Sequence, residues 1–179
     1  MTQPPEGIGL AAFNELPVER ARDALLACCS SRAWAERVGA GRPYASTAQL
    51  YAAADEAVAA MTEADLDEAL AGHPRIGERP GSSPGSGHSA SSAGWSAREQ
   101  SGVAGSDELV AANREYEERF GHVYLVCATG KTGPELLEIL RQRLGNDPAT
   151  ERRVVREELS KINKIRLQRL VEPDGGERR

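Results

Sequence analysis

The sequence predicts an all-α protein, a single-domain compact bundle of about seven helices. Its 179 residues suit one ordinary domain. Apolar residues recur at helical spacing between capping residues and glycine or proline stops. One apolar run, residues 123–128, lacks this spacing and is rich in β-branched and aromatic residues. Because a single strand has no partner, we expect this run to be a buried extended segment or an irregular helical turn.

Three helices are expected before residue 61. Pro17, then Ser30 or Ser31, then Ser46 are residue types that begin helices. Each precedes apolar residues at helical spacing, which are Ala21, Ala24, Leu25 and Cys28 in the first segment, Trp34 and Val38 in the second, and Leu50, Ala54, Ala57, Val58 and Met61 in the third.

The clearest local signal predicts a helix that begins at about Glu63. Thr62 can cap this helix. Gly72 can take the left-handed conformation that ends a helix, and Pro74 disfavours helical geometry at the residue before it. His73 is therefore expected just past a helix end.

Three further helices are expected towards the C-terminus. Each is bounded by residues that cap or stop a helix. The predicted boundaries are Ser106 and Gly121 for the first helix, Thr132 or Gly133 with Pro134 and then Gly145 for the second, and Asp147 with Pro148 and then about Val171 for the last.

The predicted domain covers residues 10–172. Residues 1–9 are expected to be a flexible N-terminus, and residues 173–179 a disordered tail. Residues 80–94 are rich in glycine, serine and proline, which predicts a flexible loop.

The composition argues against several kinds of partner. The chain is 40% hydrophobic and 27% charged, and its formal net charge is -5. This mild acidity argues against nucleic acid or anionic lipid, and no apolar run is long enough to span a membrane. Cys28 and Cys29 are adjacent in an odd set of three cysteines, and no export signal opens the chain. We therefore expect thiols without disulfides in a cytoplasmic protein.

Two familiar site patterns are incomplete in this chain. Residues 130–132, Gly-Lys-Thr, resemble the end of a phosphate-binding loop, but the earlier glycine of that loop would stand where the sequence has Leu125. We expect instead a turn that caps the next helix. His73, His88 and His122 lack metal-ligand spacing. Neither a metal nor a cofactor is expected.

A polar motif, His-Pro-Arg-Ile-Gly at residues 73–77, follows a predicted helix end directly. Pro74 would hold the preceding residue rigidly, which suits a catalytic imidazole. The alternative is that His73 only caps the helix C-terminus, where a cation is favourable.

A second motif covers residues 96–100, Ser-Ala-Arg-Glu-Gln. Ser96 and Glu99 have the spacing of a capping box. The same hydroxyl, carboxylate and amide would also suit a cradle for a small heterocycle, and the local pattern does not decide between them. Periodicity likewise does not distinguish Arg166 from the other charges of its basic helix.

Together, five segments resemble the 2-oxo-4-hydroxy-4-carboxy-5-ureidoimidazoline (OHCU) decarboxylase family in order and spacing, over residues 10–171. They are Trp34 with Arg42-Pro43, residues 73–77, residues 96–100, residues 116–127 and residues 164–167. The stretch between His73 and Ser96 departs from the family pattern by its greater length.

The resemblance implies the site residues. His73 would be the catalytic histidine and Glu99 its acidic partner, while residues 125–129 would contact substrate through the main chain. The implied substrate contacts are Pro74, Ser96, Ala97, Arg98, Glu99, Gln100, Leu125, Val126, Cys127, Ala128, Thr129 and Arg166.

The resemblance also implies the activity: a carboxy-lyase that converts OHCU to (S)-allantoin in urate and purine catabolism without a cofactor. It further implies a homodimer that is functionally coupled to urate oxidase and hydroxyisourate hydrolase. The alternative is a non-catalytic binding or regulatory module of the same fold. Loss of His73, Glu99 or Arg166 would have favoured that alternative, and all three are present.

Overall fold

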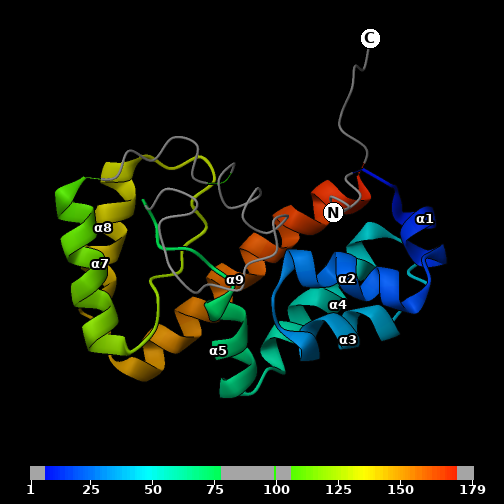
Figure 1. Ribbon diagram of the computed structural model, residues 1–179, viewed down its shortest axis with the longest axis horizontal. Coiled ribbons are helices and arrows are strands. Elements are labelled where there is room, and N and C mark those ends of the chain that lie inside the picture. Colours follow the sequence, from blue (N-terminus) through cyan, green and yellow to red (C-terminus); the bar gives the residue numbers. More distant parts are fainter. Residues whose placement is uncertain (1–6, 78–98, 100–105, 173–179) are drawn as a thin grey trace, which may run out of the picture. The chain divides into compact units, whose positions relative to one another are not determined.

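The computed structural model describes residues 7–77, 99 and 106–172 (Figure 1). These residues form eight α-helices and no strand, so the all-α prediction is confirmed. The helices are α1 (Leu10–Glu15), α2 (Val18–Cys28), α3 (Arg32–Ala40), α4 (Thr47–Ala59), α5 (Glu63–Ala71), α7 (Asp107–Phe120), α8 (Gly133–Arg143) and α9 (Pro148–Val171). The predicted loop of residues 80–94 and the predicted tail lie outside the described residues.

The described chain divides into two compact units. Unit 1 contains residues 7–69 and 160–172, and unit 2 contains residues 70–77, 99 and 106–159. Two helices, α5 and α9, contribute residues to both units.

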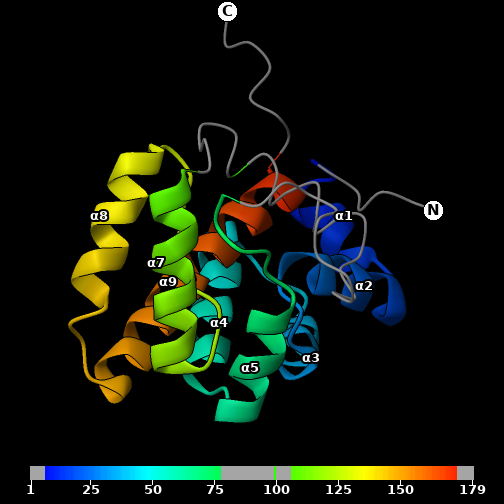
Figure 2. The same ribbon diagram turned by 60° about the vertical axis from the view of Figure 1, so that its left-hand side comes forward.

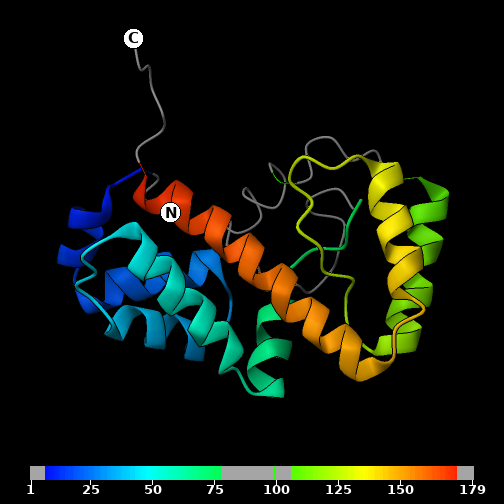
Figure 3. The ribbon, with the colours of Figure 1, turned by 180° about the vertical axis from the view of Figure 1, so that it is seen from behind.

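In unit 1, helix α3 packs against α2 and α4 (Figure 3). The predicted caps are present: the Ser31 hydroxyl accepts the Trp34 N–H at 3.3 Å, and the Ser46 hydroxyl accepts the Gln49 N–H at 3.2 Å. Trp34 is buried, and its indole N–H donates to the Ala54 carbonyl at 3.1 Å. Helices α2, α3 and α4 therefore begin where capping and spacing predicted.

Helix α1 was not predicted, because its six residues are too few to give a periodic signal. Contacts with distant residues stabilise it. The Arg42 guanidinium donates to the carbonyls of Phe13 and Leu16, both at 2.8 Å, and lies over the Phe13 ring. The short helix is thus held by tertiary structure.

Helix α5 begins as predicted and ends differently. The Thr62 hydroxyl accepts the Asp65 N–H at 3.1 Å, while the Asp65 carboxylate accepts the Thr62 N–H at 2.8 Å. Gly72 does not adopt the left-handed conformation that we expected. The chain leaves the helix through a turn in which the His73 N–H donates to the Leu70 carbonyl at 3.0 Å. The prediction that His73 lies just past the helix end is confirmed.

In unit 2, helices α7 and α8 lie side by side (Figure 2). The Ser106 hydroxyl accepts the Leu109 N–H at 3.1 Å, and Gly121, with φ 75°, ends α7 in the left-handed conformation. Thr132 and Glu135 form a capping box at the start of α8, and the hydrogen bonds from Thr132 lower the pKa of Glu135. The Gly-Lys-Thr stretch is therefore a helix-capping turn, as expected.

Helix α9 is the longest of the described helices, with 24 residues, and Figure 3 shows it uninterrupted. The Asp147 carboxylate accepts the Thr150 N–H at 2.9 Å at its start, as the Asp-Pro signal predicted. No helix in the described ranges has both the length and the apolar composition needed to cross a membrane.

Candidate active site

The turn after α5 carries His73. Proline at the next position cannot continue the helix, so the chain turns here. His73 and Pro74 are both half-buried. The imidazole is thus held against protein while part of it stays accessible.

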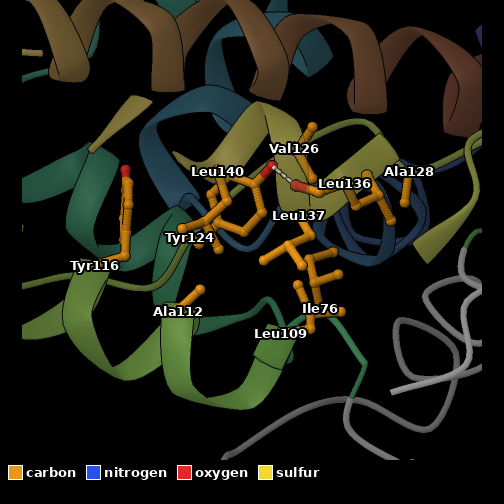
Figure 4. Close-up of a cluster of buried hydrophobic side chains, with 10 residues drawn as sticks. All are labelled: Ile76, Leu109, Ala112, Tyr116, Tyr124, Val126, Ala128, Leu136, Leu137 and Leu140. Carbon is orange, nitrogen blue, oxygen red and sulfur yellow. Dashed lines mark hydrogen bonds between the residues drawn. The ribbon is translucent and has the colours of Figure 1, made fainter. Parts of the chain in front are cut away.

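Three contacts anchor this turn in unit 2. Ile76 packs in the apolar cluster between α7 and α8 (Figure 4). The Asn113 amide donates to the Ile76 carbonyl at 3.0 Å. Arg75 donates two hydrogen bonds to the Glu117 carboxylate, at 2.6 and 3.1 Å. Helix α7 therefore fixes the turn that follows His73.

The second part of the site is the run at residues 123–128. It has no regular secondary structure and residues 124–128 are buried, so the expectation that this run is buried and is not a strand is confirmed. The Tyr124 hydroxyl donates to the Leu136 carbonyl at 3.0 Å. Val126 and Ala128 belong to the same apolar cluster as Ile76 (Figure 4). The segment and the turn with His73 are therefore neighbours.

Three charged side chains hold the main chain of this segment. Arg143 donates to the Leu125 carbonyl at 2.6 Å. The Glu158 carboxylate accepts the Cys127 N–H at 2.8 Å, and the Lys131 ammonium donates to the Cys127 carbonyl at 2.9 Å. Hydrogen bonds to charged groups are stronger than neutral ones, so this backbone is firmly positioned.

A buried ion pair supports Arg143. Its guanidinium donates two hydrogen bonds to Glu151, one of them at 2.8 Å, and the Tyr116 hydroxyl also donates to Glu151. The Asn146 amide donates to the other Glu151 oxygen at 2.9 Å. Burial alone would lower the pKa of Arg143, but the hydrogen bond with Glu151 and nearby acidic groups hold it above its ordinary value. Arg143 therefore keeps its charge inside unit 2.

Sequence reasoning missed Arg143, Glu151 and Glu158, although a signal was present. Arg143 follows the buried Leu136 by seven positions, so both lie on the inner face of α8. Glu151 and Glu158 flank the buried Val155 at helical spacing on α9. A charge on a predicted buried stripe is itself a sign of a specific partner.

Glu99, in unit 2, acts on the same segment electrostatically. It is helical and half-buried. The pKa of the Cys127 thiol is raised, first by burial and then by the carboxylates of Glu158 and Glu99, against the opposing effects of Thr129 and Lys131. The other residues of that motif, 96–98 and 100, lie outside the described residues.

Arg166 belongs to unit 1, whereas the other described candidate residues belong to unit 2. It is 1% exposed, and its guanidinium donates to the Cys28 carbonyl at 3.0 Å. Its charge favours the Cys29 thiolate, but burial has the larger effect and raises the pKa of that thiol to about 11. The three cysteines, all among the described residues, form no disulfide.

Residues 14–168 match the sequence model of the OHCU decarboxylase family. The chain is 31% identical over 142 residues to the 2-oxo-4-hydroxy-4-carboxy-5-ureidoimidazoline decarboxylase of Amia calva, covering 77% of this chain and 79% of that protein. It is 29% identical over 157 residues to the uric acid degradation bifunctional protein TTL of Arabidopsis thaliana, covering 87% of this chain and 48% of the relative. The chain thus spans about half the length of that bifunctional relative.

Two solved structures are similar to the chain. A crystal structure of OHCU decarboxylase in the presence of (S)-allantoin aligns with a TM-score of 0.64 and 27% identity, covering 83% of this chain and 96% of that chain. A crystal structure of (S)-allantoin synthase aligns with a TM-score of 0.67 over 92% of this chain and 54% of that chain. The second is 18% identical and so supports the fold alone.

Proposed function

This chain belongs to the OHCU decarboxylase family, and on that premise we propose that it decarboxylates OHCU to (S)-allantoin. The observation that carries the proposal is the grouping within unit 2. The turn with His73 and the buried segment share one apolar cluster, and the Glu99 carboxylate helps to raise the pKa of the Cys127 thiol in that segment.

The structure of the substrate explains why the reaction needs little beyond an oriented substrate and a proton donor. Its imine carbon stands next to the carbon that bears the carboxylate and the hydroxyl. When carbon dioxide leaves, the bonding electrons flow into the imine, and the resulting ene-amine must take a proton at the ureido-bearing carbon. Delivery to one face gives (S)-allantoin, so the site must orient the substrate and supply one positioned acid.

We assign these tasks to named groups. His73 and Glu99 act as a pair that polarises the substrate hydroxyl and manages the proton. Pro74, the motif at residues 96–100 and the main chain of residues 125–129 hold the ring and the ureido group. The resemblance to the family assigns Arg166, a buried cation of unit 1, to support of the anionic substrate.

The proposal extends to assembly and pathway. Relatives named for uric acid degradation support coupling to urate oxidase and hydroxyisourate hydrolase, because these two activities would supply the substrate. We propose a cytoplasmic homodimer. Analytical ultracentrifugation of the full chain would test the dimer.

The decisive experiment measures stereospecific turnover. Purified protein is added to freshly generated urate-oxidation products with hydroxyisourate hydrolase present, and optical activity is followed. Prompt appearance of (S)-allantoin is expected. Binding of (S)-allantoin without turnover would instead favour the non-catalytic module.

The role of Glu99 is tested by Glu99→Gln. The amide retains a capping side chain, so stability should change by less than ~1 kcal/mol. It cannot replace a titratable carboxylate, so turnover should fall at least ~100-fold. Normal turnover in a normally folded variant would remove Glu99 from the mechanism.

A further inference from the structure

The turn that carries His73 is held by a main-chain hydrogen bond at each end. At its start, the His73 N–H donates to the Leu70 carbonyl of α5 at 3.0 Å. At its end, the Ile76 carbonyl accepts from the Asn113 amide of α7 at 3.0 Å. Between these two points, the proline ring fixes the φ angle of Pro74 and restricts the backbone of His73. The hydrogen bond from Asn113 therefore limits the conformations that remain for the turn.

Asn113 is a buried polar residue whose presence the stability of unit 2 explains only in part. The residue is 3% exposed, and within the described part of the chain its Oδ1 atom has no hydrogen-bond partner. A buried acceptor without a partner costs free energy comparable to what one hydrogen bond contributes. The stabilisation by the hydrogen bond to Ile76 is therefore offset in part by the unpaired Oδ1. An apolar side chain at this position would avoid that cost.

A second contact between α7 and the turn is weaker. The Arg75 guanidinium donates to the Glu117 carboxylate, but the two side chains are 46% and 25% exposed, so solvent screens the pair. Glu117 follows Asn113 by four positions, which places both residues on one side of α7. Of the two contacts, the buried hydrogen bond from Asn113 is the one that water does not weaken.

We propose that Asn113 is a positioning residue for catalysis, because its amide holds the Ile76 carbonyl and thereby orients the His73 imidazole. This inference rests on the proposed function, in which His73 takes part in proton transfer. Such a group must lie within hydrogen-bonding reach of the substrate atom, so a small displacement of the turn slows the reaction. Asn113 acts through the turn and takes no part in the chemistry itself.

The first test compares the kcat of Asn113→Asp, Asn113→Ala and the wild type across pH. Aspartate has nearly the shape of asparagine, but its ionised carboxylate cannot donate to the Ile76 carbonyl. At neutral pH, the kcat of Asn113→Asp should fall about ten-fold while KM stays within about three-fold of the wild-type value. Burial and the facing carbonyl should raise the pKa of this carboxyl, so as the pH falls it becomes protonated and gains an O–H donor.

Acid should therefore bring the kcat of Asn113→Asp closer to that of the wild type at the same pH, a comparison that cancels the titrations common to both proteins. Asn113→Ala introduces no titratable group, so its kcat should stay several-fold below the wild-type value at every pH. Wild-type kcat in Asn113→Asp at neutral pH would overturn the inference. A deficit that is as large in acid as at neutral pH would overturn it as well.

Tyr44→Phe in unit 1 is the matched control for stability. It removes the buried hydrogen bond from the Tyr44 hydroxyl to the Val38 carbonyl at 2.6 Å, just as Asn113→Ala removes the one to the Ile76 carbonyl. Tyr44→Phe should lower Tm by a similar amount and leave kcat unchanged. If both variants lose Tm and kcat equally, Asn113 contributes only stability and the inference is overturned. This comparison decides the question even if Asn113→Asp does not fold.

A second measurement does not depend on turnover. In NMR spectra, the Hε1 signal of the His73 imidazole reports the surroundings of the ring. This signal should shift in Asn113→Ala and stay in place in Tyr44→Phe. A His73 signal that is the same in Asn113→Ala and in the wild type would overturn the inference even if turnover is normal. Absence of turnover in the wild type would instead contradict the proposed function, which makes the two failures distinguishable.

Discussion

The turn at residues 72–77 and the segment at residues 124–128 are stabilised in different ways. The turn is half-buried and is held through the side chains of Arg75 and Asn113. The segment is buried and is held through its own main chain by the side chains of Arg143, Glu158 and Lys131. The first arrangement leaves the His73 side chain half-buried, and the second fixes main-chain groups of a buried segment.

This difference fits the chemistry that we propose for each part. A proton-transferring imidazole needs access to substrate and freedom to change charge, so its turn lies near solvent. Main-chain hydrogen bonds gain strength when water is excluded, and charged side chains hold this segment in place. The two parts should therefore respond differently to mutation.

The largest effect is expected at His73, because its substitution removes the proposed proton-transferring group but few packing contacts. His73→Ala should slow stereospecific decarboxylation by ~10²–10⁴-fold while Tm stays close to the wild-type value. His122→Ala, which removes an imidazole outside the turn, is the control and should retain turnover. Near-normal turnover in folded His73→Ala would reduce His73 to a helix cap.

The buried segment should respond through stability. Arg143→Met leaves the Glu151 carboxylate buried without its cation, so unfolding free energy should fall by about 3–5 kcal/mol in urea denaturation. Arg141→Met is the control, because Arg141 pairs with Glu108 on the surface and should contribute less than about 1 kcal/mol. Equal losses of unfolding free energy in the two variants would contradict the expected difference between a buried and an exposed ion pair.

Loss of the hydrogen bond from Asn113 of α7 to the Ile76 carbonyl should have an intermediate effect on stability. Asn113→Ala leaves the Ile76 carbonyl without its donor, which should cost about 1–2 kcal/mol. Because the turn positions His73, kcat should also fall several-fold while KM changes less. If kcat is unchanged despite the loss of stability, the turn is positioned by other contacts.

The smallest effect is expected at the exposed ion pair. The Arg75 and Glu117 side chains are 46% and 25% exposed, so solvent screens their interaction. Arg75→Gln should lower stability by less than about 1 kcal/mol, and the loss should shrink in high salt. A loss that is larger or independent of salt would show that the turn depends on this pair as the segment depends on Arg143.

The sequence by itself determined the helices that carry local signals. Ser31, Ser46, Ser106 and Thr132 cap helices as predicted, and Gly121 ends one, because a cap is a contact between residues three or four positions apart. His73 was located for the same reason, since Pro74 acts on its immediate neighbour. The role of His73 came from resemblance rather than from these local rules.

Only the tertiary structure decided which parts of the candidate site lie together. Glu158 meets Cys127 across 31 positions, and Asn113 meets Ile76 across 37. Such pairings depend on how helices pack, and no local rule selects one partner from many along the chain. The same holds for α1, which is stabilised by Arg42 rather than by its own six residues. Local hydrogen bonding fixed where most helices begin and end, and long-range packing fixed which charged side chains hold the buried segment of the candidate site.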